Sequence, residues 1–139
     1  MARIRYLADT SVFARLTKPA VAAAFAPLAA GRRVALSTPV MFELGYSARN
    51  SADYRELTEG LRSFPGVPTT DADHQRAQEV QAALATRGQH RALSLVDALV
   101  AASAEAQNLS ILHYDADFEL VADITGQDHQ WIVPRGTSD

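Results

Sequence analysis

The sequence predicts an α/β protein, a single three-layer α/β/α sandwich built on a central parallel sheet. Short apolar segments alternate with longer helical segments along the chain, and only short loops separate them. Because parallel strands must be joined by a crossover, this alternation is typical of a parallel sheet that helices cover on both faces. The 139 residues are enough for one such domain and too few for two.

Five segments are expected to form strands. Each is a short apolar stretch between turn or capping residues, and the first also carries Ile and Tyr, which favour strands. The predicted strands are residues 4–8, 34–37, a short piece around Val67, 111–114 and 131–133.

Seven segments are expected to form helices, and most of their ends carry a cap, a proline or a glycine. Thr38 and Pro39 give an N-cap followed by a proline at the first helical position. Gly31, Gly88 and Gly126 follow the predicted ends of three helices. The predicted helices are one that follows the capping residues 9–11 and ends near 16, and then 20–30, 40–49, 52–64, 71–87, 93–107 and 116–124.

The length and composition indicate one domain in a reducing compartment. We expect one domain over residues 1–133 and a loose polar tail at 134–139. The absence of cysteine excludes disulfides, thiolate zinc sites and a cysteine nucleophile, and it fits a reducing cytoplasm, where we expect the protein. No signal-type segment is visible, and the Ala-rich stretch 20–30 is too short to cross a bilayer, so we expect no membrane contact.

The charge balance excludes a bulk electrostatic binder of nucleic acid. The chain has 13 basic and 16 acidic residues, a net charge of −3. Its single lysine, Lys18, stands in no phosphate-binding loop motif. Contact with phosphates therefore requires bound metal ions or a local basic patch around the functional pocket. The candidates for that patch are Arg5, Arg15, Arg32, Arg33, Arg87 and Arg91.

Five acidic residues stand where carboxylates are unusual. Asp9 ends the first predicted strand, and Asp115 and Asp117 directly follow the fourth. Glu43 and Asp97 are enclosed by apolar neighbours within predicted helices. Because parallel sheets bind ligands beyond the carboxyl ends of their strands, we expect these carboxylates to share one pocket.

Each of these acids also has a purely structural interpretation. Asp9 and Asp115 could cap the helices that they precede, Asp117 could interact with a helix dipole, and Glu43 could pair with an arginine. Asp97 is the hardest to explain in this way, because the interior of an apolar helix offers it neither a cap role nor solvent. An unpaired buried carboxylate costs several kcal/mol.

A shared divalent cation would offset this cost for all the acids at once. Carboxylate oxygens are the ligands that Mg²⁺ or Mn²⁺ prefers, whereas zinc prefers His or Cys. The four histidines show no metal-ligand spacing, and we expect them to be surface or structural residues. An acidic pocket with one or two such ions suits in-line displacement at phosphorus. The reaction class that the residues indicate is metal-dependent phosphodiester hydrolysis.

Four ordered motifs carry a family resemblance: LADTSV at 7–12, PVMFE at 39–43, SLVDALVA at 94–101 and DADF at 115–118. Together they resemble the PIN domain, and the chain is most similar to the VapC-type ribonuclease toxins of bacterial toxin–antitoxin pairs. The resemblance covers about residues 3–133. It implies a Mg²⁺- or Mn²⁺-dependent endoribonuclease that cleaves RNA, forms a homodimer and is inhibited by a cognate antitoxin protein.

The resemblance also implies roles for single residues. Asp9, Asp97 and Asp115 would be primary metal ligands, with Asp117 assisting at the metal and Glu43 completing the acidic pocket. Ser11 and Ser94 match small hydroxyl positions of the family, where they would support ligands or a scissile phosphate, although either could serve only as a helix cap. The implied catalytic set is Asp9, Glu43, Asp97, Asp115 and Asp117, and the implied metal ligands are Asp9, Asp97, Asp115 and Asp117.

Three alternatives fit parts of the pattern. A receiver domain also places acids at the ends of parallel strands, but it needs a lysine late in the chain, and the only lysine is Lys18. A haloacid-dehalogenase-like phosphatase needs Asp-x-Asp near the first strand, whereas Thr10 and Ser11 follow Asp9 here. A catalytically inactive PIN-like module that binds RNA or protein is the third alternative, and the presence of all the expected acids argues against it.

Overall fold

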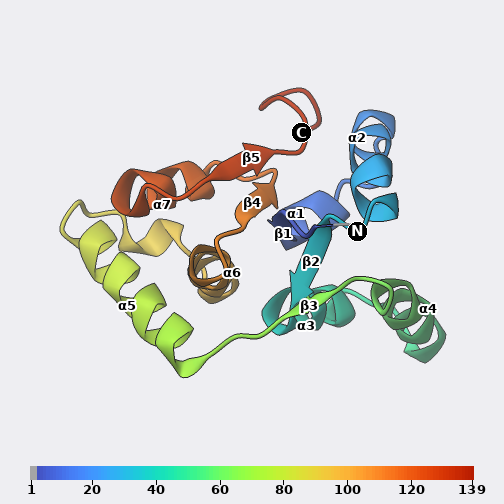
Figure 1. The fold of residues 1–139 in the computed structure, drawn as a ribbon, viewed down its shortest axis with the longest axis horizontal. Coiled ribbons are helices and arrows are strands. Elements are labelled where there is room, and N and C mark those ends of the chain that lie inside the picture. Colours follow the sequence, from blue (N-terminus) through green and yellow to red (C-terminus); the bar gives the residue numbers. More distant parts are fainter. Residues whose placement is uncertain (1–2) are drawn as a thin grey trace.

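A computed structural model describes residues 3–139, so residues 1 and 2 of the expected domain lie outside the described part. Its centre is a five-stranded, all-parallel sheet with the strand order β3-β2-β1-β4-β5 (Figure 1). In the central register, Leu7 lies beside Ala35 on one neighbouring strand and Ile111 on the other. The α/β sandwich that the sequence predicts is confirmed. The strands are β1 (Tyr6–Ala8), β2 (Val34–Ser37), β3 (Gly66–Val67), β4 (Ser110–His113) and β5 (His129–Trp131).

Seven helices and one 3₁₀ turn connect these strands within the described residues. Side-chain caps mark several starts: Asn50 accepts a hydrogen bond from the backbone N–H of Asp53 at 2.8 Å, and Thr70 and Asp73 form a reciprocal capping box. The helices are α1 (Thr10–Phe13), α2 (Pro19–Ala30), α3 (Thr38–Tyr46), α4 (Ser51–Leu61), α5 (Asp71–Ala85), α6 (Leu95–Ala106) and α7 (Asp117–Thr125), and the 3₁₀ turn η1 is His90–Ala92.

Most element boundaries differ from the sequence prediction by one to three residues, and three of these differences change how a segment is described. The first helix is a single turn that ends at Phe13, and the chain continues through turns rather than helix towards 16. The last strand pairs with β4 over His129–Trp131, so it begins two residues before its predicted start. Ile132 and Val133, which were expected within the strand, are buried but lie after it. The sixth helix begins at Leu95 rather than 93, which changes the position of Asp97 within it.

The connections place helices on both faces of the sheet. Figure 1 shows α2 and α4 on one side and α5 and α6 on the other. The chain moves from β1 outward through β2 to β3, then returns across the sheet to β4 and continues to β5. The strand order therefore reverses between β1 and β4, and this switch point is where open parallel sheets bind ligands.

The core is apolar on both faces of the sheet. Leu7, Val34, Ile111 and Leu112 are completely buried. On the α2 side, the ring of Phe13 packs edge-on against Phe25 and Phe64, with ring centroids 5.5 and 6.0 Å apart. The strands are apolar without alternation because helices cover both of their faces.

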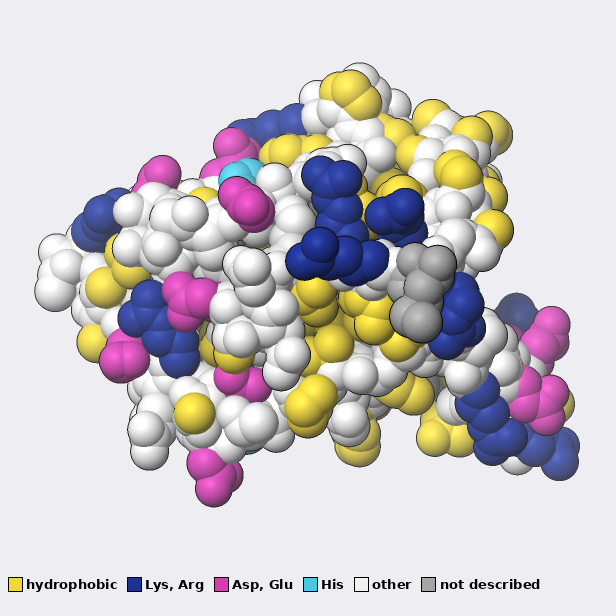
Figure 2. Space-filling model, in the orientation of Figure 1, with side chains coloured by type: hydrophobic (Ala, Val, Ile, Leu, Met, Phe, Trp, Pro, Cys, Tyr) yellow, Lys and Arg dark blue, Asp and Glu magenta, His cyan; other side chains and the backbone are white. Residues whose placement is uncertain are grey.

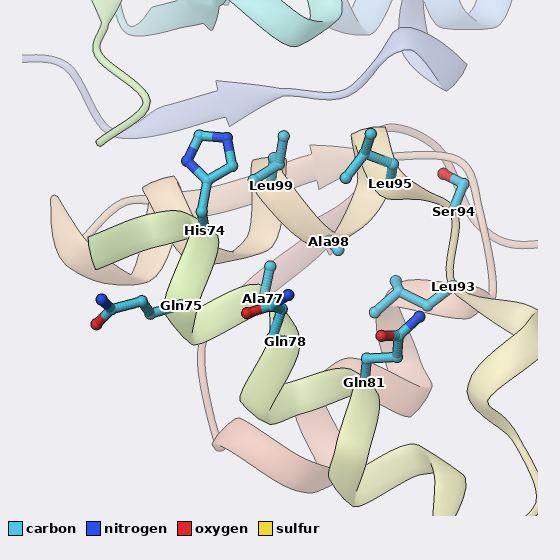
Figure 3. A pocket seen from close by; sticks show the side chains of 10 residues that line it. All are labelled: His74, Gln75, Ala77, Gln78, Gln81, Leu93, Ser94, Leu95, Ala98 and Leu99. Carbon is cyan, nitrogen blue, oxygen red and sulfur yellow. The ribbon is translucent and has the colours of Figure 1, made fainter. Parts of the chain in front are cut away.

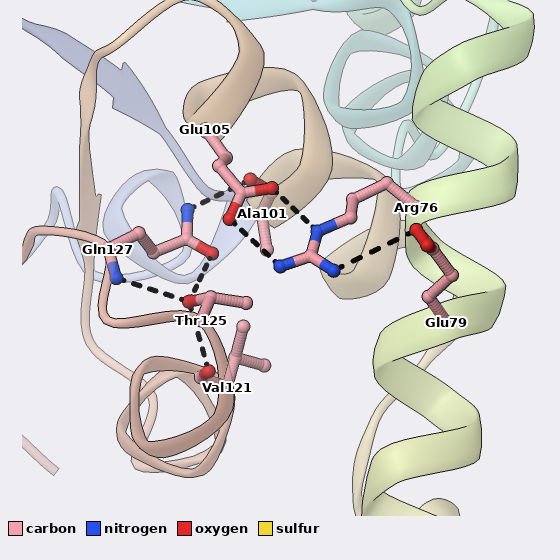
Figure 4. A network of polar contacts seen from close by, with 7 residues as sticks. All are labelled: Arg76, Glu79, Ala101, Glu105, Val121, Thr125 and Gln127. Carbon is pink, nitrogen blue, oxygen red and sulfur yellow. Dashed lines mark hydrogen bonds and ion pairs between the residues drawn. The ribbon is translucent and has the colours of Figure 1, made fainter.

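A polar network joins the helices that flank α6 (Figure 4). The Arg76 guanidinium on α5 donates two hydrogen bonds, of 2.7 and 3.2 Å, to the carboxylate of Glu105 on α6. From the other side, the Gln127 side-chain amide donates to the carbonyl of Ala101 at 2.9 Å, and Gln127 also accepts from the hydroxyl of Thr125 at the end of α7. These contacts hold α6, and with it Asp97, between α5 and α7.

The segment 134–139, where the sequence analysis expects a loose tail, makes defined contacts with the end of β4. The Tyr114 hydroxyl accepts hydrogen bonds from the backbone N–H groups of Gly136 at 3.0 Å and Ser138 at 2.9 Å. The same hydroxyl donates to a side-chain oxygen of Asp139 at 2.7 Å, and Ser138 is buried. Tyr114 therefore anchors this segment beside the carboxyl end of the sheet.

Candidate active site

Four carboxylates meet beyond the carboxyl ends of β1 and β4. Oxygens of Asp97, Asp115 and Asp117 all lie within 4.8 Å of one another. Asp9 adjoins them, since its charge raises the pKa of Asp97 and the charge of Asp115 raises its own. We refer to Asp9, Asp97, Asp115 and Asp117 as the acid centre. It lies at the switch point of the sheet, where the sequence analysis expects a pocket.

Asp9 is both a helix cap and a buried acid. Its backbone N–H donates to the carbonyl of Leu112 at 2.9 Å, which ties the end of β1 to β4. One carboxylate oxygen accepts from the backbone N–H of Ser11 at 3.1 Å and caps α1. The other oxygen is enclosed and has no hydrogen-bond partner among the described residues. A buried carboxylate oxygen left in this way is a ready ligand for a cation.

Asp97 lies in the first turn of α6, so its expected place in a helix interior is wrong. The helix begins at Leu95, and the Ser94 hydroxyl caps it by accepting from the backbone N–H of Asp97 at 3.2 Å. The first turn carries the positive end of the helix dipole, which favours a carboxylate there. Asp97 is half-buried rather than enclosed, and it faces the acid centre.

Asp115 is held by the buried His113, which pairs with the half-buried His129. Its backbone N–H donates to Nδ1 of His113 at 3.1 Å, and its side chain accepts from the backbone N–H of Asp117 at 2.9 Å. Because His113 Nδ1 accepts, the ring proton of the neutral imidazole lies on Nε2, which contacts Nδ1 of His129 at 2.9 Å. Burial, with a smaller contribution from His129, lowers the pKa of His113 to about 3, so His113 is neutral at physiological pH.

The acids of this centre resist simultaneous ionisation. Burial raises the pKa of Asp97 to about 8, and the charges of Asp9 and Asp115 add to the rise. Burial also raises the pKa of Asp9, although hydrogen bonds with Ser11 oppose this, and burial and the charge of Asp115 raise the pKa of Asp117. A divalent cation at the centre would lower these pKa values, because it would stabilise the ionised carboxylates. The oxygen-only donor set and the unpartnered oxygen of Asp9 both fit Mg²⁺ or Mn²⁺.

The comparison with protein families decides what kind of domain carries this centre. A family model described as "PIN domain" matches residues 6–124. The chain belongs to the PIN-domain family. It is 46% identical to Ribonuclease VapC51 of Mycobacterium tuberculosis over 136 residues, which cover 98% of each chain. It is also 38% identical to Ribonuclease VapC21 of the same species, over 96% of this chain and 98% of the relative.

Chains of solved structures share the fold of this protein. The VapBC2 complex of Rickettsia felis, bound to a promoter DNA fragment, contains a chain that matches 92% of this PIN domain with a TM-score of 0.73. The DNA-bound VapBC complex of Salmonella typhimurium matches 94% with a TM-score of 0.72. The matches cover 99% of each solved chain, and both are 18% identical in sequence, so they show the fold alone. Within the described residues, no helix has the length and apolar character needed to span a bilayer.

Glu43 is not enclosed in this PIN domain. It lies exposed on α3, at the edge of an apolar groove of about 370 Å³ lined by Phe42, Tyr46 and Leu95. The apolar residues that surround Glu43 in the sequence point to two sides of the helix: Val40 and Leu44 face the core, whereas Phe42 and Tyr46 face outward with Glu43. Glu43 still acts on the acid centre, because its charge contributes to the raised pKa of Asp97.

The two serines differ in their contacts. The Ser11 hydroxyl accepts from the backbone N–H of Tyr114 at 2.8 Å, so it joins α1 to the end of β4 beside Asp9 and Asp115. Ser94 caps α6 beneath Asp97 and also lies at the rim of a cavity of about 270 Å³ between α5 and α6 (Figure 3). Apolar side chains and glutamines dominate that cavity, and no carboxylate lines it.

The six arginines named as candidates for a basic patch do not all lie near the acid centre. Arg5 and Arg33 directly precede β1 and β2, so they lie at the opposite edge of the sheet, where they line one cavity with Arg3. Figure 2 shows a group of dark blue side chains near the centre of the face that it presents. Of the six candidate arginines, Arg15 is the one that lines a cavity together with Asp115. Because Arg5 and Arg33 stand at the beginning of predicted strands, the sequence already indicates that they lie away from the carboxyl ends where the acids meet.

His113→Leu tests whether the buried histidine supports Asp115. Leucine fills the site but offers no acceptor, so the N–H of Asp115 and Nδ1 of His129 lose their partners. We expect the free energy of unfolding to fall by about 1–3 kcal/mol in chemical denaturation. The exposed histidine variant His74→Leu serves as the control and should change it by less than about 0.5 kcal/mol. Equal stability of the two variants would remove His113 from this role.

Proposed function

We propose that this PIN domain is a metal-dependent endoribonuclease and the toxin of a type II toxin–antitoxin pair. The acid centre at the switch point of the sheet, with its unpartnered buried oxygen on Asp9, is the observation that supports catalysis. The full-length similarity to proteins named ribonuclease supports RNA as the substrate. No feature of the described residues favours an inactive binding module.

The residues of the acid centre and their neighbours have different roles in this hydrolysis. Asp9, Asp97, Asp115 and Asp117 hold Mg²⁺ or Mn²⁺, as one or two ions, through their carboxylate oxygens. When bound, such ions supply an activated water and offset charge on the phosphodiester. Ser11, Ser94 and His113 position the acids through the contacts described above. Glu43 adds negative charge at the rim, where it can orient a bound water.

The protein partner is a cognate antitoxin, and we propose a homodimer as the assembly. Several solved structures with this fold are toxin–antitoxin complexes. The groove beside Glu43 exposes three large apolar side chains, with 79% of Phe42, 88% of Tyr46 and 72% of Leu95 accessible to solvent. Contiguous apolar surface of this kind marks protein interfaces, and this groove lies beside the acid centre.

Cleavage of RNA by the purified chain tests the proposal directly. We expect single-stranded RNA to be cut in the presence of MnCl₂ or MgCl₂, to remain intact in EDTA, and to be cut again after the ion is restored. Metal-independent cleavage would contradict the assigned chemistry. A folded chain that binds RNA but never cuts it would favour the inactive module instead.

The toxin assignment has its own test. Expression of the chain should arrest growth, and a small protein encoded beside it should restore growth and co-purify with the chain. Failure of the neighbouring protein to bind would contradict the toxin–antitoxin pairing while leaving the nuclease activity in place.

A further inference from the structure

A cavity of about 470 Å³ adjoins the acid centre and has no role in the proposed hydrolysis. Ser11 and Asp115 are among its lining residues, so it borders the acid centre. Its other walls come from the turn after α1, the ends of β4 and β5, and the segment 134–139. We call it the flanking pocket and define it by Arg15, Tyr114, Trp131 and Arg135. Its volume is within the range of sites that bind small molecules.

Arg15 is held in place without a carboxylate partner. Its Nη1 donates to the carbonyl of Ser11 at 3.2 Å, and its guanidinium carbon lies 4.5 Å from the centre of the Tyr114 ring. Arg15 lines the pocket, and none of the ion pairs within residues 3–139 includes it. A positioned cation without a carboxylate partner beside the acid centre is suited to a phosphate.

An aromatic wall completes the pocket. Trp131 lies edge-on to Tyr114, with ring centroids 5.1 Å apart and an angle of 86° between the planes. Trp131 is half-buried, and the Arg135 guanidinium lies 5.6 Å from the centre of its ring. The hydrogen bonds of Tyr114 to residues 136, 138 and 139 hold the outer wall against this pair. Aromatic rings and arginine planes are the surfaces on which unpaired bases stack.

We propose that the flanking pocket binds one nucleotide next to the cleaved bond. Arg15 contacts the phosphate of that nucleotide, and Trp131 with Arg135 contacts its base. This inference rests on the proposed ribonuclease function and adds the direction in which the strand leaves the acid centre, over the ends of β4 and β5. It also explains how a chain with a net charge of −3 can bind RNA without a basic surface around its metal site.

The salt dependence of RNA binding tests the contact with Arg15. The parent is the full chain with Asp97→Asn, which should prevent cleavage, and the probe is a labelled single-stranded 20-mer RNA of random sequence. Adding Arg15→Gln should weaken binding about tenfold and reduce the slope of log K against log[KCl] by about 0.7. Arg55→Gln is the control, because it removes an exposed arginine on α4. It should leave the affinity within about twofold of the parent and the salt slope unchanged.

Trp131 provides an independent readout, because it is the only tryptophan of the chain. Its fluorescence should be quenched as the RNA binds, with the same midpoint as the anisotropy of the label. Arg15→Gln should shift this midpoint, and Arg55→Gln should not. Trp131→Ala should weaken binding about tenfold without changing the salt slope, because stacking releases no counterions.

The outcomes separate this inference from the function on which it rests. If the wild type neither binds nor cuts the RNA, the proposed function and the pocket assignment both fail. If the wild type cuts RNA but Trp131 does not respond and Arg15→Gln matches Arg55→Gln, only the pocket assignment fails. MnCl₂ should stabilise the otherwise wild-type Arg15→Gln chain as much as it stabilises the wild type. If MnCl₂ no longer stabilises this variant, Arg15 supports the acid centre, and the proposed nucleotide-binding role of the flanking pocket is contradicted.

Discussion

Asp97→Asn should reduce metal-dependent RNA cleavage by about a thousandfold or more. The substitution replaces one carboxylate oxygen of the acid centre with an amide and removes the charge, which weakens the hold on a cation. It leaves the helix cap intact, because the Ser94 hydroxyl caps α6 by accepting from the backbone N–H of residue 97. Activity should therefore be lost without loss of the fold, which initial rates and circular dichroism would measure.

The matched control is Asp71→Asn. Asp71 is also an aspartate in the first turn of a helix, but it lies exposed on α5 and outside the acid centre. Its replacement removes the same charge from a similar backbone position, so the cleavage rate should stay within about twofold of the wild type. Equal activity of Asp97→Asn and the wild type would remove Asp97 from the metal site.

The stability of the metal-free protein should fall as the pH rises from about 5 to 8. Folding raises the pKa of Asp97 from 3.8 to about 8, so the folded chain binds a proton that the unfolded chain has released. The stabilisation by this proton is complete below pH 4 and is lost as the pH approaches 8. The raised pKa values of Asp9 and Asp117 act in the same direction. Because the Asp97 carboxyl is partly exposed to solvent, we expect a loss of about 2 kcal/mol rather than the full linkage value.

Thermal unfolding in EDTA between pH 5 and 9 measures this effect. In Asp97→Asn, the unfolding temperature should depend less on pH than in the wild type, because an amide does not ionise. For the same reason, this variant should be more stable than the wild type at pH 8. MnCl₂ should stabilise the wild type more at pH 8 than at pH 6, since the ion competes with the proton for the same oxygens. A wild type and an Asp97→Asn variant with the same pH dependence would show that Asp97 is not the titrating group.

Residues at strand ends were the most predictable part of the site. Asp9 and Asp115 each follow an apolar strand, and all strands of a parallel sheet end at the same edge, so the pattern alone puts both on that edge. The pairing of β1 with β4 then brings them together. Asp117 is two residues further along and is joined to Asp115 by a hydrogen bond. The absence of cysteine already limited a metal site here to oxygen and nitrogen ligands.

Residues on helices were less predictable, because their direction depends on where the helix starts and how it packs. Asp97 was placed in a helix interior, but a start at Leu95 puts it in the first turn. Glu43 has apolar neighbours on both sides in the sequence, yet Phe42 and Tyr46 are exposed, so those neighbours do not enclose it. An apolar neighbour in the sequence is not evidence of burial when part of the apolar surface faces outward.

The sequence by itself determined the class of the fold and the edge of the sheet that carries the acids, and it predicts the kind of ion that they would hold. These properties depend on local patterns: apolar strands, helix caps and the residues that follow each strand. Only the tertiary structure decided that Arg15 lies beside Asp115, and that Tyr114 bonds to residues 136, 138 and 139 next to Trp131. Such contacts join residues more than 20 positions apart, and they depend on packing and loop paths that no local pattern encodes.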